Sequence, residues 1–230
     1  MGKAKKQSIY LKSIFLFFAI FSFGYAKDFV IIDKPIDFSP NRISMTKDYI
    51  KVHYGLDVKD ITINPKIIVL HWTAVPTLEG SFDRLRPELL LTDRKDIAAA
   101  GAVNVSSHFL VDRDGTIYRL MPENYMARHT IGLNYYAIGI ENVGGKGDKS
   151  EDLTQAQVKA NAYLVRYLKT KYPDIELLMG HHEYAKMKKT KYWLEKDDNY
   201  FTQKNDPGDI FMNAVRSKVV DIGLKNPSEF

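Results

Sequence analysis

One short stretch, residues 66–73, constrains the fold more than any other part of the sequence. Its residues are Lys-Ile-Ile-Val-Leu-His-Trp-Thr. Four consecutive apolar residues that include two Ile and one Val are typical of a strand buried on both faces, and such strands lie mid-sheet under flanking helices. His71 follows where the strand ends, at the edge where open α/β sheets hold their ligands. The sequence therefore predicts an α/β fold and makes His71 a candidate ligand or base, with a structural core histidine as the alternative.

The first 26 residues have the composition of a secretory signal peptide. Residues 1–12 contain four lysines and no acidic residue, residues 13–23 are almost entirely apolar, and small residues precede a cleavage site after Ala26. The apolar run is too short to cross a membrane comfortably. We therefore expect export to the periplasm or the extracellular space, with no stable membrane span after cleavage. An uncleaved N-terminal anchor is the alternative.

Composition favours one core and excludes several kinds of chemistry. The 230 residues, 45% of them hydrophobic, are enough for one sizeable domain, which we place at residues 65–223 after an extension at residues 27–64. The net charge is +5, but without the four lysines of the signal peptide 29 basic and 28 acidic side chains remain, so basicity does not argue for a nucleic-acid partner. The absence of cysteine excludes disulfides, thiolate nucleophiles and cysteine-ligated zinc.

Further elements follow from periodicity and turn residues. In the extension we expect an extended arm and a short helix near residues 44–53. Alternating apolar residues on both sides of Asp-Gly at 114–115 predict a β-hairpin. A capping-box pattern at residues 154–157 begins a helix that Pro173 ends. We also expect a helix over residues 81–100, interrupted at Pro87, strands over 136–142 and 175–179, and a last helix over 209–222.

Polar residues come directly after three predicted buried strands. Glu141 occupies the position where an apolar residue would continue its strand, and a buried carboxylate costs several kcal/mol unless it is paired, hydrated or protonated. His181 follows the strand at 175–179, and Asp206 precedes the last helix. Together with His71, these side chains are candidates for a single functional site in one cleft.

Two imidazoles and one carboxylate are a typical ligand set for catalytic zinc. Such a set leaves the fourth tetrahedral position for water, and Glu141 would be free to accept a proton from that water. Nitrogen ligands favour zinc over calcium or magnesium, although iron and manganese stay open. His182 is a rival to His181, since only one of two successive side chains should face the metal.

Six pieces of the chain, in order, resemble the type 2 family of zinc-dependent N-acetylmuramoyl-L-alanine amidases, which is related to the peptidoglycan recognition proteins. The pieces are Leu-His-Trp-Thr-Ala at 70–74, Ser-His-Phe-Leu-Val with Asp-Gly-Thr-Ile-Tyr at 107–118, Ala-Arg-His-Thr at 127–130, Ala-Ile-Gly-Ile-Glu at 137–141, Met-Gly-His at 179–181 and Lys-Asn-Asp-Pro-Gly at 204–208.

The resemblance implies a central mixed sheet flanked by helices and assigns roles to the residues that match. It implies His71, His181 and Asp206 as ligands of one zinc ion, Glu141 as general base and Lys204 as the group that stabilises the oxyanion. It also selects His181 over His182 as the ligand. Apart from the neighbouring motif, the sequence around Lys204 is typical of a solvated surface lysine.

The expected substrate is peptidoglycan or its muropeptides, and the expected state is a monomer. His129 matches a position that lies beside bound muropeptide in relatives, and we assign Trp72 and Asn134 to the substrate with it. The segment at residues 186–201 is longer than in compact relatives, so the resemblance does not define the local path of the chain there.

Three other functions are compatible with parts of the sequence. A non-catalytic peptidoglycan-binding module could use the same fold, although such modules typically lose a zinc ligand. A zinc peptidase acting within the stem peptide would need its own ligand spacing, which is not found. A structural envelope protein would bind no zinc.

Overall fold

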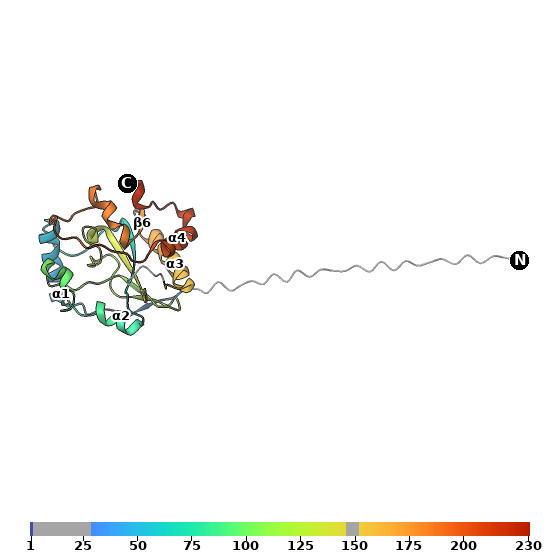
Figure 1. Ribbon diagram of the computed structural model, residues 1–230, viewed down its shortest axis with the longest axis horizontal. Helices are drawn as coiled ribbons and strands as arrows, with labels where there is room; N and C mark the ends of the chain where they lie inside the picture. Colours follow the sequence, from blue (N-terminus) through green and yellow to red (C-terminus); the bar gives the residue numbers. More distant parts are fainter. Residues whose placement is uncertain (2–28, 146–151) are drawn as a thin grey trace.

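The strands of this protein form one mixed sheet with helices on both faces (Figure 1). The computed structural model describes Met1, residues 29–145 and residues 152–230, so the predicted signal peptide, apart from Met1, lies outside the described residues. The strand order is β1-β4-β3-β5-β2-β6, and every neighbouring pair is parallel except β3 and β4. The strands are β1 (Ile31–Asp33), β2 (Ile67–Trp72), β3 (Phe109–Val111), β4 (Ile117–Arg119), β5 (Ala137–Asn142) and β6 (Leu177–Gly180).

Alternation along β2 divides the core into two layers. Ile68 and Leu70 pack with the apolar faces of α3 and α4, whereas Ile67 and Val69 pack on the opposite face with α1 and the residues after it. Figure 1 shows α1 on one side of the strands and α3 and α4 on the other. The α-helices are α1 (Pro40–Tyr49), α2 (Leu78–Leu85), α3 (Gln155–Lys171) and α4 (Asp209–Lys218). A π-helical turn, η1 (Ile50–Tyr54), continues α1, and the short 3-10 helices are η2 (Lys95–Ala100), η3 (Asn134–Tyr136), η4 (His181–Lys189), η5 (Val220–Ile222) and η6 (Pro227–Glu229).

Several predicted elements are confirmed. β3 and β4 form the antiparallel hairpin around residues 114–115. Helix α3 begins with the predicted capping box, in which Thr154 and Gln157 each accept a hydrogen bond from the other's backbone N–H. The six residues of β2 are all buried, as the run of apolar residues requires.

Other predicted elements are wrong in their bounds. The helix expected over residues 81–100 is interrupted around Pro87, as predicted, but its bounds are wrong, because α2 ends at Leu85 and the next helix begins only at Lys95. Pro87 lacks the N–H that a helix needs, and the chain after it runs extended, with Leu90 donating its N–H to the carbonyl of Ala102. Helix α1 begins at Pro40, earlier than expected, because Ser39 caps it.

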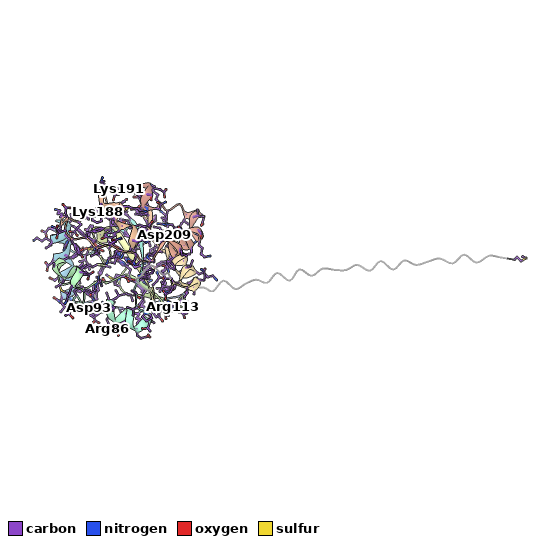
Figure 2. The ribbon with its side chains drawn as sticks, in the orientation of Figure 1. Arg86, Asp93, Arg113, Lys188, Lys191 and Asp209 are labelled. Atoms are coloured by element: carbon purple, nitrogen blue, oxygen red, sulfur yellow. The ribbon has the colours of Figure 1, made fainter. Side chains whose placement is uncertain are left out.

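Residues 31–33, near the start of the described range 29–145, are part of the sheet. β1 pairs with β4 at the edge of the sheet, so the expected extended arm is a strand there. Charged side chains such as Asp93, Lys188 and Lys191 lie at the exposed periphery (Figure 2). A search of the described ranges finds no helix with the length and apolar character that a membrane crossing requires.

Candidate metal centre and catalytic cleft

Three buried side chains from separate segments meet at the carboxyl ends of the central strands. β2 and β6 are parallel neighbours, so His71 near the end of β2 and His181 directly after β6 lie at the same edge of the sheet. Asp206 comes from the loop that precedes α4. These residues are only 1%, 7% and 7% exposed, respectively. Parallel strand order thus brings together ligands that are far apart in the sequence.

His182 fixes the loop that carries Asp206. Its backbone N–H donates to the carbonyl oxygen of Asp206 at 2.8 Å, and its ring Nδ1 lies 3.0 Å from the same oxygen. The other ring nitrogen, Nε2, lies 3.0 Å from Oδ1 of Asp209. Both ring nitrogens of His182 are therefore engaged outside the centre, and the ring of His181 is the one that enters it.

The three candidate ligand atoms form a nearly equilateral triangle. Nδ1 of His71 lies 3.0 Å from Nδ1 of His181 and 3.2 Å from Oδ2 of Asp206, and the third side of the triangle, from His181 to Asp206, is 3.1 Å. Ligand atoms around a tetrahedral zinc ion with bonds of about 2.0 Å are separated by about 3.3 Å. The residues therefore fit a small divalent cation, and two nitrogens with one oxygen suit zinc better than calcium or magnesium.

Electrostatics keep this donor set in the form that a metal requires. Burial lowers the pKa of His181 to about 4, although the carboxylate of Asp206 opposes the shift. Burial alone would raise the pKa of Asp206, but His181 and His71 outweigh it and hold that pKa below its ordinary value. At neutral pH the site thus offers a neutral imidazole at His181 and an ionised carboxylate, as ligand binding demands.

Glu141 lies beside this triangle with an unsatisfied oxygen. β5 pairs with β2 in a register that sets Glu141 opposite His71. Its buried Oε2 has no hydrogen-bond partner among the described residues. Burial raises the pKa of Glu141 to about 7; His71 opposes this shift and Asp206 adds to it, while the cations of Arg94 and Lys204 also oppose it. A carboxyl group with a pKa near neutrality is suited to accepting and returning a proton.

All eight site residues predicted from the sequence line one cleft, and four of them have not yet been described: Lys204, Trp72, His129 and Asn134. Lys204 is half-buried and stands two residues before Asp206. Trp72, the last residue of β2, is 6% exposed, and a side chain at Gly145 would overlap its ring. The cleft wall at Trp72 is therefore packed from behind by the backbone at residue 145.

Asn134 and His129 face the cleft with their polar atoms already engaged. The side-chain oxygen of Asn134 accepts the backbone N–H groups of His129 and Thr130, at 2.9 and 2.7 Å. Its amide nitrogen donates to the hydroxyl of Tyr54 at 3.0 Å. Nδ1 of His129 lies 3.0 Å from Nε2 of His71, on the side of that ring away from the triangle. Burial also lowers the pKa of His129 well below its ordinary value.

Two arginines of the cleft, Arg84 and Arg94, were not predicted from the sequence. Both arginines line the cleft wall. Nη2 of Arg84 lies 2.9 Å from Oδ2 of Asp93, and Nε of Arg94 lies 3.1 Å from Oδ1 of Asp96. Both arginines lie outside the apolar stripe of the helix expected over this segment, and arginines outside such a stripe are ordinarily solvated. No local signal in the sequence distinguishes them from surface arginines.

The sequence pattern of the family described as N-acetylmuramoyl-L-alanine amidase, type 2, matches residues 62–209. This range is more than half of the chain and contains every residue of the cleft named above. The chain belongs to this amidase family.

Relatives agree with this assignment. The amidase is 32% identical to the endolysin of Klebsiella phage KP32 over 105 residues, which are 43% of this chain and 69% of the phage protein. It is 33% identical to the endolysin of Escherichia phage T7, with the same coverage of both chains. Among solved structures, N-acetylmuramoyl-L-alanine amidase LysC from Clostridium intestinale URNW is similar with a TM-score of 0.51 and 22% identity, over 85% of this chain and 99% of LysC. The similarity to LysC concerns the fold, and it agrees with the mixed sheet and flanking helices of the amidase.

Proposed function

We propose that this amidase hydrolyses the amide bond between N-acetylmuramic acid and L-alanine in peptidoglycan, releasing stem peptides from glycan, with one zinc ion held by His71, His181 and Asp206. Membership of the family supports peptidoglycan amidase activity. One observation carries the mechanism: three ligand atoms 3.0 to 3.2 Å apart lie in the same cleft as the unpaired Oε2 of Glu141.

The residues of the cleft divide the reaction between them. Zinc, when bound, would lower the pKa of water and polarise the scissile carbonyl. Glu141 accepts the proton of the attacking water as the new carbon–oxygen bond forms. The ammonium group of Lys204 offsets the negative charge that develops on the carbonyl oxygen. Glu141 then returns the proton to the departing nitrogen of L-alanine as the amide bond breaks, so that protons and charge balance.

We assign the wall formed by Trp72, His129 and Asn134 to the substrate. The position of all three along the cleft supports this assignment. Since the polar atoms of Asn134 are engaged inside the protein, its part is to hold the backbone of residues 129 and 130 at the cleft.

We further propose that the enzyme acts as a monomer outside the cytoplasm. The composition of residues 1–26 supports export. The relatives in phages are named endolysins, which is consistent with a substrate in the cell wall.

The decisive test is Glu141→Ala, assayed on purified peptidoglycan sacculi with the zinc content measured in parallel. We expect retained zinc and activity reduced by about a thousandfold or more, because proton transfer is lost while the ligands stay. Glu79→Ala, which removes an exposed carboxylate outside the cleft, is the matched control and should keep full activity. Equal activity of the Glu141 variant would remove this residue from the mechanism.

Mass spectrometry of the digest tests which bond is cut. Glycan free of peptide together with intact stem peptides supports the amidase reaction. Shortened stems that stay attached to glycan would instead identify a zinc peptidase. Binding to sacculi without any released product would identify a non-catalytic module, although the complete ligand triangle does not favour that function.

A further inference from the structure

A second imidazole holds the far side of His71. Nδ1 of the His71 ring belongs to the ligand triangle, and Nε2 lies 3.0 Å from Nδ1 of His129. The two rings meet edge to face, with centroids 5.1 Å apart. His71 is 1% exposed, so water cannot substitute for this partner on Nε2 without rearrangement.

The hydrogen bonds of His129 define which nitrogen carries a proton. Nε2 of His129 lies 3.3 Å from the carbonyl oxygen of Ala137, and a carbonyl can only accept, so this Nε2 is protonated. In the neutral ring Nδ1 is then an acceptor, and it receives the Nε2–H of His71. That leaves the lone pair of His71 on Nδ1, directed at the triangle. The hydroxyl of Thr130, 2.9 Å from the same Nδ1 of His129, can rotate to donate or to turn away.

The ring of His129 is seated firmly enough to orient its neighbour. A Cβ at residue 139 would come within 2.8 Å of the ring, so the ring lies directly on the backbone of β5 at Gly139. Behind it lies His108, whose Nδ1 accepts the N–H of Gly139 at 2.9 Å and whose Nε2 donates to the carbonyl of Tyr125 at 2.8 Å. The centroids of the His108 and His129 rings are 5.9 Å apart. A glycine in the middle of a buried strand thus has a specific purpose here, which is to admit an imidazole.

We propose that His129 is a positioning residue, which fixes the tautomer and the ring orientation of His71 so that Nδ1 faces the metal centre. This inference rests on the proposed function, because it presumes that His71 binds zinc. Partners that hydrogen-bond the outer nitrogen of a metal-binding imidazole typically change metal affinity by about 10- to 100-fold. The role differs from substrate contact, which would leave metal affinity unchanged.

The test measures the zinc affinity of metal-free protein by competition with a chromophoric chelator. His129→Leu replaces the imidazole with an apolar group of similar size that cannot accept the N–H of His71. We expect the zinc affinity of this variant to be about 10- to 100-fold weaker. His129→Asn places Oδ1 near the position of the ring Nδ1, so it should recover most of the loss. Thr130→Val, which removes the hydroxyl and keeps the shape, is the control and should stay within about 3-fold of the wild type.

Two further measurements separate positioning from a general structural effect. Nitrogen chemical shifts of His71 in metal-free protein should report protonation at Nε2 in the wild type and a mixture of tautomers in His129→Leu. Gly139→Ala should weaken zinc affinity through displacement of the His129 ring, and it replaces the leucine variant if that variant fails to fold.

The outcomes distinguish this inference from the proposed function. If the wild type binds no zinc, both are overturned. If the wild type binds zinc and His129→Leu binds it equally well with one His71 tautomer, the positioning role alone is overturned. A loss in Thr130→Val as large as in His129→Leu would also overturn it, since the hydroxyl would then be the essential partner.

Discussion

In the part of the chain that the structure describes, two buried groups combine histidine with a carboxylate, and they differ in whether imidazole lone pairs stay free for a metal. In the first, His53 and Glu195 are 4% and 9% exposed. Nδ1 of His53 lies 2.9 Å from Oε1 of Glu195, and Nε2 lies 3.0 Å from the carbonyl oxygen of Ala100. Both nitrogens of this imidazole are occupied, so the pair joins η1 to the end of η2 and to the loop that carries Glu195, and it has no imidazole lone pair for a metal. Of the polar side-chain atoms of this pair, only Oε2 of Glu195 lacks a hydrogen-bond partner among the described residues.

In the second group, His71, His181 and Asp206 direct three atoms at one another. Their other contacts hold the rings and the loop in place, but the triangle itself has no protein group at its centre. Burial and residue type are nearly the same in both groups. Convergence of lone pairs therefore distinguishes a candidate metal centre from a structural pair.

The largest expected difference concerns metal binding and activity. His71→Ala should lose zinc and nearly all activity, because two remaining ligands cannot hold the ion in a catalytic geometry. His53→Gln, which changes the histidine of the His53–Glu195 pair, should keep one zinc per chain and most of its activity. Metal analysis and sacculus digestion measure both, and removal of zinc with a chelator should lower the melting temperature of the wild type. Zinc loss in the His53 variant alone would reverse the assignment of the two groups.

A second effect concerns pH and a third imidazole, His108. Both of its ring nitrogens are hydrogen-bonded inside the protein, as those of His53 are. Burial lowers the pKa of His108 to about 4 from an ordinary value of 6.5, and its hydrogen bonds to Tyr125 and Gly139 only partly oppose this. The unfolded chain therefore binds a proton more readily, so stability present above pH 6.5 is lost as the pH falls through 4. The full loss is about 3 kcal/mol at about 1.4 kcal/mol per pH unit.

Urea denaturation of metal-free protein between pH 4 and pH 7 measures this loss. His108→Gln, which cannot titrate, should show a shallower dependence of unfolding free energy on pH over that range. Parallel curves for the variant and the wild type would show that His108 is not the group that titrates.

A third, smaller effect concerns the charge of Glu195 in the His53–Glu195 pair. Glu195→Gln keeps an oxygen that can accept from His53 and from the backbone N–H groups of residues 196 and 197, which the carboxylate accepts at 3.1 and 3.0 Å. Only the extra strength of a bond to an ionised acceptor is lost, so we expect destabilisation of about 1 kcal/mol with unchanged zinc content. Chemical denaturation measures the change, and a loss of zinc would mean that the pair is coupled to the metal centre.

The same contrast explains how much could be predicted from the sequence. His71, His181 and Glu141 were accessible because each follows or ends a run of buried strand residues, and a parallel sheet must bring such ends to one edge. Asp206 lies in a loop, and only the motif around it identified it. The sheet and its flanking helices followed from the same strand patterns together with the family resemblance.

What the sequence could not supply depends on the path of irregular segments. Arg84 and Arg94 lie on opposite sides of Pro87, and the extended chain between them is held by pairing with residues 102 and 103 rather than by local preference. The contact between His129 and His71 joins residues 58 apart and needs Gly139 beneath the ring. Periodicity records which face a residue occupies, but it does not record which side chain will lie on a glycine of another strand.

The smallest effect belongs to a third combination of histidine and carboxylate, His182 with Asp209, which is open to solvent. Nε2 of His182 lies 3.0 Å from Oδ1 of Asp209, but the side chain of Asp209, at the start of α4 (Figure 2), is 84% exposed. Water competes with such a pair, so Asp209→Asn should change the unfolding free energy by less than about 0.5 kcal/mol, including the lost charge at the helix start. The backbone N–H of His182 would still hold the carbonyl of Asp206, so zinc affinity should also stay unchanged. A larger change in either quantity would mean that Asp209 acts on the Asp206 loop through the His182 ring, and exposure would then be a poor guide to which of these groups is inert.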